Sequence, residues 1–378
     1  MKIGIICYPS VGGSGIVATN LGKALAALGH EVHFISYDRP FGLDVKKPNL
    51  FFHQVSINEY PLFKYPDYTL PLTETILMVH QRYTLDVVHV HYAVPHATAA
   101  LFAKRILATG GAVPPKIVTT LHGTDITLLA QDPNLFTVIK YSIERSDGVT
   151  AVSHSLKSDT ISTLQTDKPI EVIHNFYTPE KITQSPSAIR KKLKISDDDF
   201  LAIHLSNLRP VKRIPDLLQI AKLMKGRKNF KLLILAGGDF AQFRPLVKKY
   251  GIAKSLAVLE NIADIGSYIN ASDIGLYTSE TESFGMGILE TMAYGKPVLA
   301  TRAGGIPEVL RDGADGYLFP VGSTTGFAKK LAELMANPDL TAALGRSAAS
   351  HAREKFSSGA IVRQYLEFYC HSCDKRTN

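Results

Sequence analysis

The sequence predicts an α/β protein made of two open domains, each built around a parallel β-sheet. Short apolar segments of strand length alternate with segments of helical periodicity along the chain. This alternation pauses near residue 178 and starts again at residue 200. Strands separated by helices need crossover connections, which produce parallel sheets covered by helices. A length of 378 residues agrees with about two to three domains.

In the first half of the chain, the apolar segment Lys2–Cys7 predicts a buried strand. A helix should follow it, because apolar residues from Val17 to Leu28 recur at helical spacing and Gly29 ends the pattern. Further strands are predicted at Glu31–Ser36, Leu85–His91, Lys116–Leu121, Gly148–Val152 and Ile170–His174.

The segment Thr178–Asp199 is rich in proline, serine and charged residues, which predicts a linker. Beyond it the alternation resumes, and strands are predicted at Phe200–Leu205, Lys231–Leu235, Leu256–Leu259, Asp273–Tyr277 and Pro297–Ala300. The last helix carries an apolar stripe that must be buried against another element. This stripe consists of Ile361, Tyr365, Leu366 and Tyr369.

Composition excludes several classes of protein. The 42 Lys and Arg residues exceed the 34 Asp and Glu residues by 8 charges, which favours an anionic partner without identifying it. No segment reaches the ~20 apolar residues of a membrane span. Three cysteines cannot form a disulfide framework, so we expect a cytoplasmic protein. The spacing of Cys370 and Cys373 lacks the context of a zinc or redox site.

In open parallel sheets, ligands bind at the carboxyl ends of the strands. Gly13, Ser14 and Gly15 lie at the first strand-to-helix turn, where free helix amides can bind a phosphate. With Ala18 they also match the dinucleotide pattern, and Asp38 is then the candidate ribose ligand. This turn leaves three interpretations open: a nicotinamide site, another phosphate site, or a tight turn without a ligand.

Histidines follow two predicted strands. His89 and His91 share one face of a strand, which permits a metal site, although no carboxylate or cysteine completes the ligand set by spacing. His122 lies at the end of the next strand, where it can hydrogen-bond a substrate hydroxyl or transfer a proton. We expect Asp125 to cap the helix that follows.

Three cations follow the first strand of the second half. Arg209, Lys212 and Arg213 lie within five residues at the carboxyl end of that strand. Their guanidinium and ammonium groups could clamp a pyrophosphate. A solvated basic turn is the alternative for such a charge cluster.

Two glutamates surround a glycine-rich helix start. Glu282 precedes the predicted helix, and Glu290 lies about two turns into it, ~12 Å along the axis. Carboxylates at this spacing can accept hydrogen bonds from separate pairs of sugar hydroxyls, while the amides between them face a phosphate. A helix cap with an unrelated surface glutamate is the alternative. It leaves Gly285 and Gly287 unexplained, because glycine destabilises a helix unless the backbone must come close to another group.

These motifs, together with residues 303–309, resemble the retaining GT-B glycosyltransferases of family 4 along essentially the whole chain. Within the family, the first half is most similar to the members that act in bacillithiol biosynthesis. That similarity lies in residues 7–15, 89–96, 121–125 and 151–155.

The resemblance implies two Rossmann-like domains that face a cleft. These are residues 1–180, on which a helix at 357–378 packs, and residues 195–356. It implies transfer of GlcNAc from UDP-GlcNAc to the hydroxyl of L-malate, with retention by front-face attack. It implies no cofactor, no divalent metal, no nucleic acid and no membrane span, and it leaves a homo-oligomer open.

The resemblance also implies residue roles. Glu282 contacts the donor sugar and Glu290 the ribose, and Arg209 and Lys212 neutralise the departing diphosphate. His122 lies near the anomeric centre, where it supports the developing oxocarbenium character or binds the 6-hydroxyl of the sugar. The other donor-binding residues it implies are Gly13, Ser14, Gly15, Ser283, Phe284, Gly285 and Met286. The acceptor-binding residues it implies are Ser14, Tyr92, Thr120 and Asn175.

Rival interpretations use fewer of these residues. A nicotinamide dehydrogenase leaves Glu282 and Glu290 without a role, and a nucleic-acid-binding protein needs a continuous basic face, whereas the cations here are scattered. A sugar-nucleotide sensor, or a relative with an inositol phosphate or lipid-linked acceptor, would keep the donor residues. The sequence 197–199 contains the DxD pattern of metal-dependent glycosyltransferases, but we expect a solvated loop before a strand.

Overall fold

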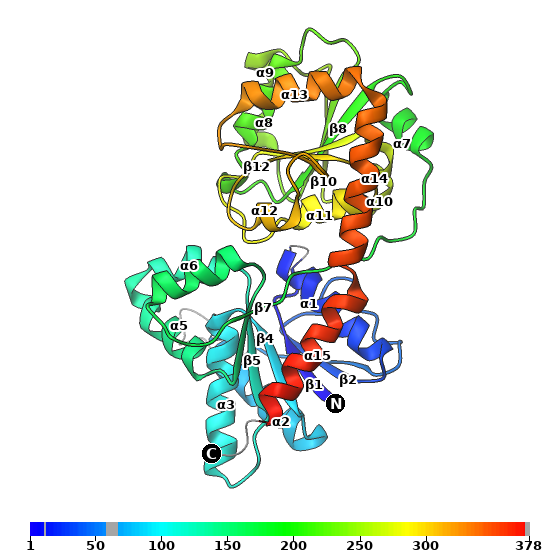
Figure 1. The fold of residues 1–378 in the computed structure, drawn as a ribbon. Helices are drawn as coiled ribbons and strands as arrows, with labels where there is room; N and C mark the ends of the chain where they lie inside the picture. Colours follow the sequence, from blue (N-terminus) through cyan, green and yellow to red (C-terminus); the bar gives the residue numbers. More distant parts are fainter. Residues whose placement is uncertain (11–12, 58–66, 375–378) are drawn as a thin grey trace. The chain divides into compact units, whose positions relative to one another are not determined.

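The computed structural model describes residues 1–10, 13–57 and 67–374 (Figure 1). The chain forms two compact units, each with its own β-sheet. Unit 1 comprises Met1–Asn175 and Ser358–Asn378, and unit 2 comprises Phe176–Ser357. Within the described ranges, no helix is long and apolar enough to cross a membrane.

Unit 1 contains a seven-stranded sheet in the order β3-β2-β1-β4-β5-β6-β7, and every neighbouring pair is parallel. The chain order reverses between the adjacent strands β1 and β4, and such a switch point is where open α/β sheets bind ligands. The strands are β1 (Lys2–Ile6), β2 (Glu31–Ser36), β3 (Leu50–Gln54), β4 (Val87–His91), β5 (Lys116–Leu121), β6 (Gly148–Ala151) and β7 (Glu171–Val172).

Helices cover both faces of this sheet (Figure 1). α1 and α15 pack on the face that carries Phe34 and His89, and α2 and α3 pack on the face that carries Val88 and Val90. Gly22 allows α1 to approach, since a Cβ there would lie 2.3 Å from the Phe34 ring. The helices are α1 (Gly13–Ala27), α2 (Thr69–Tyr83), α3 (Thr98–Thr109), α4 (Thr124–Thr127), α5 (Pro133–Arg145), α6 (His154–Leu164) and α15 (Ser358–Asp374), with short turns η1 (Ala93–Ala97) and η2 (Leu129–Gln131).

The last helix, α15, completes the core of unit 1. Ile361, Tyr365 and Tyr369 are buried, as the apolar stripe predicts, and the helix contacts α1, β5 and β6. The Tyr369 hydroxyl lies 2.7 Å from Nδ1 of His89, so a hydrogen bond joins residues 280 positions apart. The first and last segments of the chain therefore fold as one unit.

Unit 2 contains a six-stranded parallel sheet in the order β10-β9-β8-β11-β12-β13. The strands are β8 (Phe200–Ser206), β9 (Phe230–Ala236), β10 (Leu256–Glu260), β11 (Ile274–Tyr277), β12 (Val298–Thr301) and β13 (Gly316–Phe319). Helices α8, α9 and α13 pack on one face, and α7 and α10 on the other. The helices are α7 (Pro186–Leu193), α8 (Ile214–Leu223), α9 (Arg244–Tyr250), α10 (Ile265–Ala271), α11 (Met286–Ala293), α12 (Ile306–Val309), α13 (Thr324–Ala336) and α14 (Pro338–Lys355), with turns η3 (Pro210–Lys212) and η4 (Ala241–Phe243).

The structure departs from the predicted elements in two places. Neither β3 nor β13 is among the predicted strands, and both lie at the edge of a sheet. An edge strand is less covered than a central one, so its apolar pattern is incomplete: only Leu50 of β3 is buried. The predicted linker Thr178–Asp199 contains a helix, α7, whose Ile189 packs beside Tyr268 beneath β8 and β9. Ser185 caps this helix by accepting the Ala188 amide at 3.2 Å.

Candidate active site

In unit 2, the loops after β8 and β11 meet at an ion pair between the Lys212 Nζ and the Glu282 carboxylate. These two side chains are 18% and 19% exposed. The Ser279 hydroxyl lies 3.4 Å from the same carboxylate oxygen, and the Thr278 hydroxyl donates to the Lys212 carbonyl at 3.0 Å. Arg209 is exposed at the start of the basic turn. The fold thus brings a predicted cation to a predicted carboxylate.

The backbone of Glu282 is held by the glycine pair at the start of α12. The amide of Gly305 donates to the Glu282 carbonyl oxygen at 2.8 Å. Gly304 has φ +52°, and a Cβ there would lie 2.1 Å from that same oxygen. No larger residue fits this contact, so the glycines of the 303–309 segment fix the Glu282 loop.

The two glycines at the start of α11 have different structural causes, and the helix begins later than predicted. Gly285 precedes the helix with φ +104°, so the helix begins at Met286 and Glu290 lies about one turn into it rather than two. A Cβ on Gly287 would lie 2.9 Å from the Tyr277 ring. This glycine therefore allows close packing of the helix on the sheet, and the group that its backbone approaches is the Tyr277 ring.

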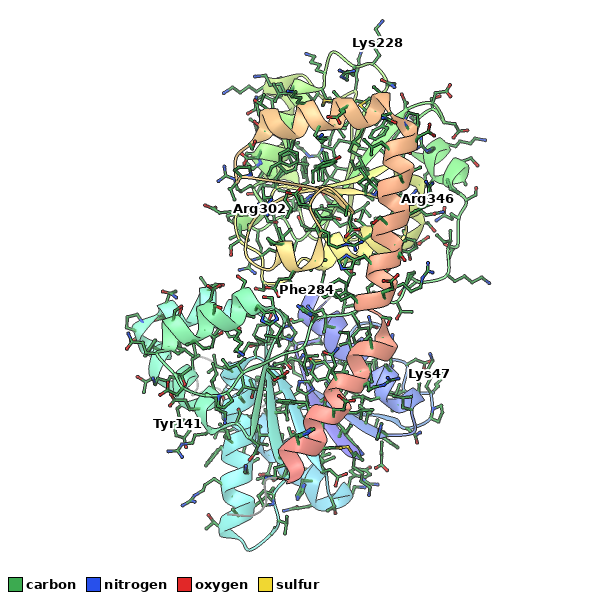
Figure 2. The ribbon with its side chains drawn as sticks, viewed as in Figure 1. Lys47, Tyr141, Lys228, Phe284, Arg302 and Arg346 are labelled. Atoms are coloured by element: carbon green, nitrogen blue, oxygen red, sulfur yellow. The ribbon has the colours of Figure 1, made fainter. Side chains whose placement is uncertain are left out.

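Phe284 belongs to the core of unit 2. Its side chain, labelled in Figure 2, is 2% exposed. It packs edge-to-face on Phe356, with ring centroids 5.7 Å apart. Only the backbone of Phe284 is therefore available for the predicted contact with the donor substrate. Ser283 and Met286, on either side of the Phe284–Gly285 pair, are half-buried.

Glu290 is a buried carboxyl group without a cation. It is 9% exposed and makes no ion pair or hydrogen bond with another residue in the described part of the chain. Burial, with a smaller contribution from the charge of Glu180, raises its pKa to about 8. At neutral pH much of this carboxyl is protonated, so it can both donate and accept a hydrogen bond.

In unit 1, His122 contacts a second histidine at the carboxyl edge of the sheet. His91 Nδ1 lies 2.8 Å from His122 Nε2, and the rings stack with centroids 5.0 Å apart. His89 stacks on the other side of His91 at 4.5 Å. Burial lowers the pKa of His122 and of His89 to about 3 and that of His91 well below its usual value. All three rings are therefore neutral at physiological pH.

Tyr92 and Ser14 link β4 to the first turn of α1. The Ser14 Oγ and the Tyr92 hydroxyl lie 3.0 Å apart. Tyr92 has φ +93°, which is strained for a residue with a side chain and is typical of functional sites. Gly15 must be glycine here, since a Cβ would lie 2.7 Å from the Tyr8 carbonyl oxygen. The glycine turn and Tyr92 thus form one local structure, with Gly13 at its helix start.

The remaining predicted residues of unit 1 are buried. The Thr120 hydroxyl lies 2.6 Å from His89 Nε2 and 2.7 Å from the Thr150 hydroxyl. Asn175 is 5% exposed, and its Oδ1 has no hydrogen-bond partner among the described residues. Asp125 does not cap α4, because it lies inside that helix and accepts the Gly123 amide at 3.1 Å. Burial raises the Asp125 pKa to about 6.

The residues of the metal and dinucleotide alternatives have other roles here. Among the described residues there is no group of three or more His, Cys, Asp or Glu side chains that could hold a metal ion. His89 uses both ring nitrogens in hydrogen bonds, to Tyr369 and Thr120. Asp38 accepts the amide of Arg39 at 2.7 Å. Of the DxD pattern, Asp197 is exposed, whereas the Asp199 side chain is 14% exposed and accepts the Ser196 amide at 3.0 Å in the turn before β8.

Sequence reasoning did not identify the partner of His122 or the packing residue of α11. His91 is visible in the sequence only as part of the His89-x-His91 spacing on one strand face. Its approach to His122 depends on the pairing of β4 with β5. Tyr277, which donates to the Gly287 carbonyl at 2.6 Å, gives no signal beyond its place at the end of a predicted strand.

Two family models match the chain. The model of glycosyltransferase family 4 matches residues 11–181, and the model of glycosyl transferases group 1 matches residues 186–351.

The chain is 44% identical to N-acetyl-alpha-D-glucosaminyl L-malate synthase of Bacillus anthracis, over 98% of this chain and 96% of that protein. Its fold is similar to that of sucrose-phosphate synthase from Thermosynechococcus elongatus, with a TM-score of 0.81, 20% identity and 98% of each chain covered. It is also similar to the Anabaena protein HepE in complex with UDP and glucose, with a TM-score of 0.82, 20% identity, and 98% and 100% of the two chains covered. At 20% identity, the two solved structures establish the fold alone.

Proposed function

The chain belongs to the family 4 glycosyltransferases of GT-B fold, and from this premise we propose that it transfers N-acetylglucosamine from UDP-GlcNAc to the hydroxyl of L-malate. This reaction is the first step of bacillithiol biosynthesis. The malate synthase of Bacillus anthracis supports this choice of substrates, since the similarity covers nearly the full length of both chains.

The observation that supports the donor half is the Lys212–Glu282 ion pair, together with the buried carboxyl of Glu290 on α11. We assign Glu282 to the hydroxyls of the donor sugar and Glu290 to the ribose. A partly protonated carboxyl at Glu290 suits a diol, because it can donate to one hydroxyl and accept from the other. Ser283, the backbone of Phe284 to Met286 and the α1 residues Gly13 to Gly15 complete the proposed donor contacts.

The proposed chemistry follows from the charges that develop. The malate hydroxyl oxygen bonds to the anomeric carbon while the bond from that carbon to the β-phosphate oxygen breaks. The hydroxyl proton passes to a β-phosphate oxygen, UDP leaves, and front-face attack retains the configuration. Glu282 holds the Lys212 ammonium in place, so this cation meets the new negative charge with little reorganisation. Arg209 is exposed beside it for the same purpose.

Unit 1 supplies the acceptor half. L-malate carries two carboxylates, so its site needs hydrogen-bond donors, and Ser14 and Tyr92 offer two hydroxyls within 3.0 Å of each other. Asn175 contributes a buried side-chain amide whose Oδ1 has no hydrogen-bond partner among the described residues. The Thr120 hydroxyl is already bound to His89 and Thr150, so Thr120 would act on the site through His89.

We further propose that the reaction uses no divalent metal and takes place in the cytoplasm. The positive charge at the diphosphate would come from Arg209 and Lys212. Asp199 of the DxD pattern supports metal independence in one respect, because its carboxylate already accepts a backbone amide in the turn before β8.

The test is to incubate the protein with UDP-GlcNAc, with and without L-malate, in the presence of EDTA. UDP release is followed by chromatography and the product by mass spectrometry. We expect UDP release that depends on malate, together with a GlcNAc-malate mass. UDP-GlcNAc binding without turnover would overturn the acceptor, and an inositol phosphate arm then tests another one. Turnover lost in EDTA and restored by Mg²⁺ would overturn metal independence.

A further inference from the structure

His91 lies where it can control the hydrogen-bonding state of His122. It is fully buried, and its only ring hydrogen bond within the described residues joins Nδ1 to His122 Nε2 at 2.8 Å. The second ring nitrogen, Nε2, is buried without a hydrogen-bond partner in the same set of residues. His122 is half-buried, and its Nδ1 makes no hydrogen bond with the described residues.

The position of the His91 ring is itself fixed. Its ring is stacked between His89 at 4.5 Å and His122 at 5.0 Å. His89 cannot rotate freely, because Tyr369 and Thr120 bind its two nitrogens. The His91 carbonyl accepts a hydrogen bond from His96 Nδ1 at 2.6 Å, which holds the backbone at this point.

The hydrogen bond between His91 and His122 can have its proton on either ring, and one of these two arrangements leaves a more costly group unpaired. If His122 donates, the neutral His91 ring carries its proton on Nε2, as a buried N–H without an acceptor. If His91 donates from Nδ1, its Nε2 is an unpaired acceptor instead. Buried N–H groups without a partner are rarer in proteins than acceptors that are not fully used. The second arrangement is therefore favoured, and it places the His122 proton on Nδ1.

We propose that His91 is a positioning residue that donates from Nδ1 to His122 Nε2 and so locks His122 as a neutral donor at Nδ1. This inference rests on the proposed function, in which His122 lies near the anomeric centre. The locked N–H would donate to an oxygen of the bound donor sugar or to the attacking hydroxyl of malate. A fixed tautomer spares the enzyme the cost of selecting one when the substrate binds.

The test compares two variants of His91 in the full chain. In His91→Asn the side-chain amide N–H occupies the place of Nδ1–H and can still donate to His122. In His91→Leu this donor is lost at similar volume. We expect kcat with UDP-GlcNAc and L-malate to fall roughly 10-fold to 100-fold in His91→Leu, as for other residues that orient a functional histidine, with largely unchanged KM values. His91→Asn should recover most of kcat.

The control is His80→Leu, which removes another buried histidine of unit 1, one that binds the Val113 carbonyl through Nε2 at 3.2 Å. It should leave kcat unchanged even if it lowers the melting temperature. Loss of kcat in His91→Asn as large as in His91→Leu would overturn the proposal.

A measurement without substrate tests the tautomer of His122 independently of the proposed function. Two-dimensional ¹⁵N–¹H spectra of histidine-labelled protein distinguish the two neutral tautomers, and His122→Gln identifies the signals of His122. We expect the wild-type His122 to carry its proton on Nδ1 and to become a mixture of tautomers in His91→Leu. A proton on Nε2 in the wild type would contradict the inference. Absence of GlcNAc-malate formation with the expected tautomer would count against the function alone.

Discussion

The ammonium of Lys212 pairs with the carboxylate of Glu282, a residue 70 positions further along the chain. The loops after β8 and β11 bring them together, because these strands are neighbours in the sheet of unit 2. The contact brings the basic turn that follows β8 next to Glu282, the first of the two predicted site glutamates. In the sequence alone, the cations could equally form a solvated turn, and Glu282 could belong to a helix cap.

Replacing Lys212 by Met should lower kcat/KM for UDP-GlcNAc by roughly 100-fold to 1,000-fold, the usual effect of removing one preorganised donor. The reason is that Glu282 would lose its partner and the leaving diphosphate would lose a cation. Steady-state UDP release measures the change. Lys222→Met, on α8, is the control and should retain wild-type kinetics. A Lys212→Met enzyme with normal kcat/KM would remove Lys212 from the proposed mechanism.

Gly304→Ala should displace the Glu282 loop and weaken UDP-GlcNAc binding, since the new Cβ would lie 2.1 Å from the Glu282 carbonyl oxygen. Calorimetric titration with UDP-GlcNAc measures the loss of affinity. Gly313→Ala is a matched control, because Gly313 also has a positive φ (+77°) but has no atom within 4 Å of the added Cβ. Both variants should lose stability, by about 1 kcal/mol or more, but only Gly304→Ala should lose affinity. Equal affinities would show that this contact does not position the site.

The buried carboxyl of Glu290 should make stability fall as pH rises. Its folded pKa is raised from 4.5 to about 8, so between these values the folded state binds more protons than the unfolded state. The contribution is fully present below about pH 4.5 and is lost as pH rises through 8. We therefore expect the stability of Glu290→Gln relative to wild type to increase from pH 5 to pH 8.5, as measured by urea unfolding. Glu333→Gln, on the exposed side of α13, should show no such trend.

Tyr369→Phe should lower the free energy of unfolding by about 1–3 kcal/mol, because it leaves the buried Nδ1 of His89 without its partner. Urea unfolding measures this cost. Tyr141→Phe removes a hydroxyl from a side chain that is 55% exposed and should be neutral. If both variants unfold at the same urea concentration as wild type, α15 is not anchored through this hydrogen bond.

The central strands and the edge strands β7 and β10 were predictable, whereas the edge strands β3 and β13 and the directions of the side chains were not. Apolar runs such as Lys2–Cys7 mark strands buried on both faces, but only Leu50 of β3 is buried, and its apolar segment is just three residues long. Phe284 and Thr120 are among the residues implied to bind substrate, yet the side chain of Phe284 packs on Phe356 and that of Thr120 binds His89. Periodicity reports burial along one element, and it does not report which neighbour a side chain meets.

The sequence by itself determined the α/β class, the strand-helix alternation and the residues that gather at the carboxyl ends of the strands. These properties depend on local periodicity and on the direction of parallel strands. Only the tertiary structure decided that Lys212 pairs with Glu282, that Gly304 clamps its backbone and that His91 binds His122. Each of these contacts joins residues on different loops or strands. Their geometry is set by strand order and packing, for which no local pattern exists.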